Sequence, residues 1–91
     1  MKGIFMERLN RINEAGTAYL IAETDLNSIR LMGAVGRKYR EAKETAEAAR
    51  DNLVAVFKES GYTLEELEAL RMPDGSPALG YGISDVLKNE V

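Results

Sequence analysis

The sequence predicts an all-α protein, in which a long central helix lies between an N-terminal helix and a C-terminal unit of short helices. The first proline is Pro73, and the stretch before it is rich in Ala, Leu, Glu, Lys and Arg, which lose little conformational freedom in a helix. Residues typical of helix N-termini then stand at Thr63 and Ser84. Because 91 residues is a usual length for one domain, we expect residues 1–91 to form a single domain.

The N-terminal segment, residues 1–24, is expected to be helical. Apolar side chains recur at helical spacing at Ile4, Phe5, Leu9 and Ile12. Gly16 is a position at which this first helix can stop or bend. The stretch 17–24 (TAYLIAET) begins with six uncharged residues and fits either a helix or a short strand. Helix is favoured because no second strand-like segment lies nearby to pair with it.

The central segment, residues 25–60, is predicted to be one long helix. Asp25 can cap its start, and Gly61 can take the left-handed position after its end. Such a helix is about 50 Å long at 1.5 Å per residue, whereas a compact globule of this size is about 30 Å across. It must therefore protrude, break or pair with another chain, and Gly33 and Gly36 are the expected break points.

Small and apolar residues in this helix alternate steps of three and four, the pattern of a coiled-coil seam. They are Met32, Val35, Tyr39, Ala42, Ala46, Ala49, Leu53 and Val56. The alanines allow close helix approach but bury little apolar area. The seam predicts a homodimer, and an intramolecular hairpin with residues 4–24 is the competing interpretation.

The C-terminal segment, residues 61–91, carries the clearest local signal. Thr63 can cap a helix over residues 64–71, with Glu66 reaching back to the Thr63 N–H in a capping box. Turn-forming residues follow, and Ser84 can cap a last helix over residues 85–91.

The composition excludes most site chemistry. The chain has no Cys and no His, so it offers neither a thiolate nor an imidazole for metal binding or catalysis, and no phosphate-loop or dinucleotide-binding motif is present. We therefore predict no catalytic residue, no cofactor and no metal site, and a protein that is not an enzyme. Since no secretory signal or membrane-spanning stretch is found, we expect a cytoplasmic protein without a membrane partner.

Charge divides the chain into unlike halves. Residues 1–43 carry a net charge of +3 and residues 44–91 a net charge of −6. The candidate contacts to nucleic-acid phosphates are the cations around Tyr39, namely Arg30, Arg37, Lys38, Arg40 and Lys43. The alternative is a solvated helix face supported by ion pairs one turn apart.

The stretches EAARDNL at 47–53, GYTLEEL at 61–67 and GISDVL at 82–87 resemble small helix-turn-helix proteins common in actinobacteria and their phages. The resemblance covers about residues 40–91. It implies that the last helix enters the DNA major groove, with base-reading positions at Ser84, Asp85, Lys88 and Asn89. The linker of residues 71–81 is longer than the family's turn, and residues 61–91 carry two cations against six acids.

Two functions follow from these features. The first is a small DNA-binding transcription regulator of helix-turn-helix type, acting as a dimer. The second is a non-enzymatic interaction module, such as a phage or plasmid adaptor or inhibitor, whose acidic C-terminal half docks on a basic protein surface.

Overall fold

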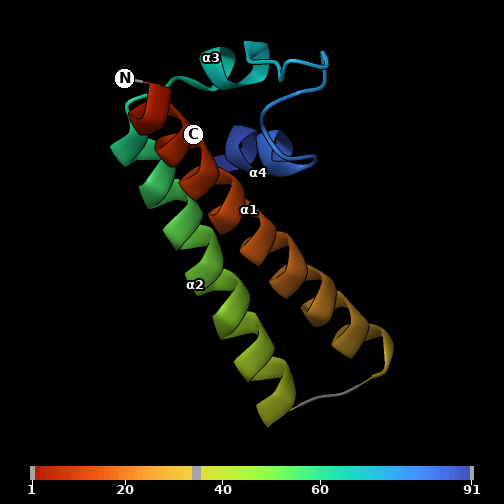
Figure 1. Ribbon diagram of the computed structural model, residues 1–91. Helices are drawn as coiled ribbons and strands as arrows, with labels where there is room; N and C mark the ends of the chain where they lie inside the picture. Colours follow the sequence, from red (N-terminus) through yellow and green to blue (C-terminus); the bar gives the residue numbers. More distant parts are fainter. Residues whose placement is uncertain (1, 34–35, 91) are drawn as a thin grey trace.

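The protein is an all-α structure built on a long helical hairpin (Figure 1). The structure is a computed structural model that describes residues 2–33 and 36–90. Its helices are α1 (Lys2–Leu31), α2 (Arg37–Ser60), α3 (Leu64–Ala69) and α4 (Ile83–Glu90). Helices α1 and α2 run antiparallel along the 47 Å length of the molecule, and α3 and α4 lie at the end where α1 begins and α2 ends. The predicted all-α class is thereby confirmed.

The boundary expected between residues 24 and 25 is wrong, because α1 runs through it without a break. Asp25 lies exposed inside the helix and caps nothing, and Thr17–Thr24 is helical throughout. Gly16 does not stop the helix either. The reason is tertiary packing: Ala15, Ala22 and Leu26 are all buried, so the apolar face of the first segment continues past both positions.

The predicted break at Gly33 and Gly36 is confirmed. Both glycines have positive φ angles, 73° and 86°, a conformation that side chains with a Cβ rarely adopt. The Gly33 N–H donates to the Arg30 carbonyl and closes the last turn of α1. The long central helix is thus shortened to α2, and Gly61 follows its end in the left-handed conformation, as predicted.

Of the two interpretations of the seam, the intramolecular hairpin is the one that the structure contains. Tyr39, Ala42, Ala46 and Ala49 pack in a small cluster with Ala22 and Leu26 of α1. Leu53 and Val56 belong to the larger core at the other end. Met32 is 82% exposed, and Val35 lies outside the described residues. The buried seam residues, Ala46 and Leu53, both pack in clusters with residues of α1.

The larger core joins all four helices. It contains Leu9, Ile12, Ala15, Leu53, Phe57, Leu67, Leu79, Ile83 and Leu87. The capping box at the start of α3 is present as predicted, with the Glu66 N–H donating to Thr63 Oγ1 and the Thr63 N–H to Glu66 Oε1. Helix α3 ends at Ala69 rather than residue 71, because Leu70 turns extended and Arg71 pairs in an antiparallel bridge with Pro77.

The expected cap at Ser84 is wrong. Helix α4 already begins at Ile83, one residue earlier, and Ser84 lies in its first turn. Its hydroxyl donates to Glu68 Oε1 at 2.7 Å instead of accepting a backbone N–H of its own helix. Glycine at position 82, with φ of 85°, turns the chain into α4.

Gly16 has a packing role that the sequence pattern does not reveal. A Cβ at this position would lie 2.5 Å from the Cδ1 and Cγ1 atoms of Ile83, a residue only 1% exposed. Helix α4 therefore rests directly on the backbone of α1. We infer that the glycine is required because it removes the atom that would hold the two helices apart.

The Gly16→Ala variant should lower the free energy of unfolding by about 1–3 kcal/mol in urea denaturation, because overpacking a buried contact outweighs the gain of about 1 kcal/mol in helix propensity. Thr17→Ala is the control, because Thr17 is the next residue and its side chain is exposed. It should change the free energy of unfolding by less than about 0.5 kcal/mol. Adding Ile83→Ala to Gly16→Ala should cost less than the sum of the two single changes. Additive costs would contradict the contact.

Candidate interaction surfaces

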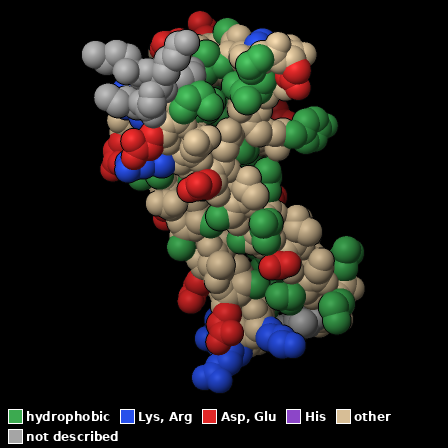
Figure 2. Space-filling view, viewed as in Figure 1, with side chains coloured by type: hydrophobic (Ala, Val, Ile, Leu, Met, Phe, Trp, Pro, Cys, Tyr) green, Lys and Arg blue, Asp and Glu red, His purple; other side chains and the backbone are tan. Residues whose placement is uncertain are grey.

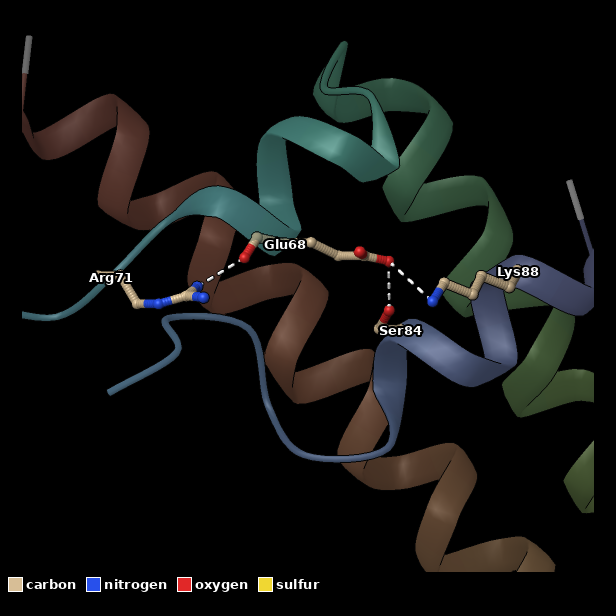
Figure 3. A network of polar contacts seen from close by, with 4 residues as sticks. All are labelled: Glu68, Arg71, Ser84 and Lys88. Carbon is tan, nitrogen blue, oxygen red and sulfur yellow. Dashed lines mark hydrogen bonds and ion pairs between the residues drawn. The ribbon is translucent and has the colours of Figure 1, made fainter. Parts of the chain in front are cut away.

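The residues implied for base reading lie on α4, but two of the four are engaged within the chain. Ser84 Oγ donates to Glu68 Oε1, and Lys88 Nζ lies 3.4 Å from the same oxygen (Figure 3). Asp85 and Asn89 are exposed. The side chain of Glu68 thus joins α3 to α4 and sits beside the surface that would face DNA.

The Glu68 carboxylate is held in its charged form. The hydrogen bond from Ser84, followed by the positive charge of Lys88, lowers the pKa of Glu68 below its ordinary value. Arg71 Nη1 donates to the backbone carbonyl of Glu68 at 2.6 Å (Figure 3). It also donates to the backbone carbonyl of Leu70 at 2.9 Å. Both cations of residues 61–91 are therefore in contact with Glu68, and Lys88 is partly neutralised by it.

The predicted phosphate-binding residues gather at the opposite end of the hairpin from α3 (Figure 1). Four of the five, Arg37, Lys38, Arg40 and Lys43, lie in the first turns of α2, and Arg30 lies in the last turn of α1. All five are exposed. The five cations lie at the same end of the molecule, but they do not all face the same way. Lys38 lines one groove between α1 and α2, and Lys43 lines a different one.

Two of these cations have partners. Arg30 Nη2 donates to Tyr39 Oη at 3.2 Å, and its guanidinium lies 5.8 Å from the centre of the Tyr39 ring. This hydrogen bond and the charge of Arg30 lower the pKa of Tyr39. Arg37 Nε lies 3.7 Å from Glu41 Oε1, an exposed pair that contributes little. Within the described residues, Lys38 and Arg40 make no ion pair.

The sequence interpretation missed the apolar side chains beside these cations. Leu31 is 89% exposed and Met32 is 82% exposed. We call Arg30, Leu31, Met32, Arg37, Lys38 and Arg40 the hairpin tip. In Figure 2 this lower end of the molecule carries basic and hydrophobic side chains next to each other. The sequence feature that could have indicated these exposed side chains is the uncharged stretch between Arg30 and Arg37. It was not interpreted in this way because Met32 was assigned to the seam.

A second missed feature is Tyr81, which is 101% exposed in the turn before α4. The side chain of Asn13 on α1 makes two hydrogen bonds to the backbone of the segment that precedes it. Asn13 Nδ2 donates to the Ala78 carbonyl at 3.0 Å, and the Gly80 N–H donates to Asn13 Oδ1 at 2.7 Å. Tyr81 is thus presented to solvent from a fixed backbone.

The described residues provide open grooves and no assembled metal site. A groove of about 430 Å³ lies between α1 and α2, with Ala22, Ile29 and Ala42 on its apolar lining. No group of three or more Asp and Glu residues is placed to hold a metal ion within the described part of the chain. Across residues 2–33 and 36–90, none of the helices is both long and apolar enough to cross a bilayer.

Comparison with known proteins gives no match: neither a family model, nor a curated protein, nor a solved structure is significantly similar to this chain.

The Glu68→Gln variant should lose a pH-dependent part of stability. Because the pKa of Glu68 is lower in the folded state than its ordinary 4.5, the carboxylate stabilises the fold above that value, and the contribution disappears as the pH falls through the folded pKa. Thermal melts should give the variant a lower melting temperature than the parent at pH 7. The two melting temperatures should become equal at a pH below the folded pKa of Glu68.

Glu65→Gln is the matched control, since Glu65 is exposed on the same helix. A Glu68→Gln variant whose stability differs from the parent by the same amount at every pH would contradict the role given to this carboxylate.

Proposed function

We propose that the protein is a non-enzymatic helical interaction module whose acidic C-terminal half docks on a basic surface of a partner protein. The observation that carries the proposal is the complete exposure of Tyr81 on a fixed turn beside α4. An exposed tyrosine buries a large area on binding while losing few rotamers, and tyrosine is enriched among the residues that dominate protein interfaces.

The net negative charge of the segment that carries Tyr81 supports a basic partner. Residues 61–91 carry six acids and two cations, and both cations, Arg71 and Lys88, contact Glu68. Asp85 lies exposed four residues after Tyr81, on the first turn of α4. A segment of net negative charge that carries an exposed aromatic anchor attracts a basic surface and selects against acidic partners.

The rigidity of the segment adds to the proposal. Asn13 fixes the backbone on both sides of Leu79, and the buried Leu79 and Ile83 anchor the chain before and after Tyr81. A side chain presented from an ordered backbone loses less conformational entropy on binding than one on a loose loop.

A DNA-binding regulator is the second candidate, favoured by the cations of the hairpin tip. Its implied base-reading helix is less favourable, because Glu68 engages Ser84 and Lys88 and places a carboxylate where phosphates would approach. The tip cations also lie at the far end of the hairpin from α3 (Figure 1). Phosphate contacts and base contacts would therefore have to come from separate parts of the molecule.

The proposal is tested by purifying the tagged chain from its native host, identifying the bound protein and measuring its affinity by calorimetry. Tyr81→Ala should weaken binding by about 2 kcal/mol or more, about 30-fold, as expected for a central aromatic anchor. Ile21→Ala, at an apolar residue 59% exposed on α1, is the control and should leave the affinity unchanged. Binding that survives Tyr81→Ala at full strength contradicts this use of the surface.

The DNA alternative makes a different prediction. In gel-shift titrations, a DNA complex should form at low salt, and the slope of log affinity against log salt should fall by about 2 when Arg37→Gln and Lys38→Gln are combined, because each phosphate contact contributes about 0.9. Lys88→Gln should then relax the sequence preference. If no complex forms at low salt, the DNA alternative is excluded.

A further inference from the structure

The hairpin tip combines exposed apolar side chains with basic ones. Leu31 and Met32 are almost fully exposed, and they are neighbours at the last turn of α1. Their backbone is ordered: the Met32 N–H donates to the Ser28 carbonyl at 3.1 Å, and the Gly33 N–H closes the turn behind it. The two apolar side chains are therefore carried outward on a helix end.

Positive charge gathers at the same end of the molecule as these apolar side chains. The stretch 30–43 carries five Lys or Arg and one Glu, whereas the rest of the chain carries seven Lys or Arg and fourteen Asp or Glu. One end of the 47 Å molecule is thus strongly basic and the remainder is strongly acidic. An anionic surface attracts the tip and repels the acidic part of the chain, residues 44–91, which favours an approach with the tip first.

We propose that the hairpin tip docks on an anionic lipid surface, with Leu31 and Met32 entering the interface and Arg37, Lys38 and Arg40 lying at the level of the headgroups. Apolar side chains that project from a convex end need no complementary pocket in a lipid layer, and the flanking cations add attraction to anionic headgroups. Charge complementarity selects anionic over neutral lipid. This contact concerns the end of the molecule opposite α3 and is independent of the function proposed above.

Nucleic acid fits the same cations less completely. Phosphates would use Lys38 and Arg40 but leave Leu31 and Met32 in water, whereas a lipid surface uses both kinds of side chain. The expectation of no membrane partner came from the lack of a spanning segment, and a surface contact needs none. A helix end of this kind lies on a membrane without crossing it.

The chain contains no tryptophan, so a single introduced one reports on the tip alone. Met32→Trp should shift its emission to the blue, and lipid-borne bromine should quench it, when vesicles of 30% phosphatidylserine in phosphatidylcholine are added at low salt. Pure phosphatidylcholine vesicles should leave the emission unchanged. Ile21→Trp, on the middle of α1, is the matched control and should be neither shifted nor quenched.

Two pairs of substitutions separate the contributions. Removing two cations, with Arg37→Gln and Lys38→Gln in the otherwise native chain, should lower the partition coefficient about 30-fold, since each cation near an anionic surface contributes about a factor of five. Leu31→Ser with Met32→Ser should lower it by at least about tenfold, because the buried apolar area is lost. All four positions are exposed, so circular dichroism should show an unchanged helix content.

Failure of Met32→Trp to shift with phosphatidylserine vesicles at low salt overturns the proposal. Equal binding to neutral vesicles overturns the role of charge. If the serine variants bind vesicles as well as the native chain and also bind duplex DNA more tightly than vesicles, the tip is a nucleic-acid surface instead. None of these results depends on Tyr81, so the two proposals fail separately.

Discussion

The antiparallel packing of α1 on α2 is the contact on which the remaining structure depends. At one end it buries large side chains such as Ile12, Leu53 and Phe57, and the C-terminal helices add Leu67 and Leu87 to the same core. At the other end, the buried residues among those that the structure describes are the smaller set Ala22, Leu26 and Ala46. Because apolar burial scales with area, most of the stabilisation lies at the end that carries α3 and α4. The hairpin tip is held by helix continuity and by small residues that permit close approach.

Local signals in the sequence were sufficient for the features that depend on neighbouring residues. The capping box of Thr63 and Glu66 and the break at Gly33 and Gly36 are decided within a few positions along the chain. Gly16 could not be interpreted in this way. Its missing Cβ accommodates Ile83, a residue 67 positions away, and no periodicity in α1 indicates that contact. In the sequence, a glycine that ends a helix cannot be distinguished from one that allows a second helix to pack closely.

The candidate surfaces show the same division between local and distant causes. The cluster of cations before Lys43 is visible in the sequence, and the structure keeps it exposed at one end. The engagement of Ser84 and Lys88 by Glu68 depends on how α3 packs on α4, so the spacing of α4 alone could not reveal it. Likewise, the exposure of Leu31, Met32 and Tyr81 depends on which elements fail to cover them.

The shortness of α3 has a consequence for how the C-terminal half holds together. Six residues are too few to remain helical alone, because nucleating a helix costs more than one turn returns. Helix α3 persists through its cap, through Leu67 in the core and through the link from Glu68 to Ser84 and Lys88. Loss of α4 would remove the last of these and expose the core beneath. We therefore expect residues 64–90 to unfold as one cooperative unit, so that truncation before α4 also destabilises α3.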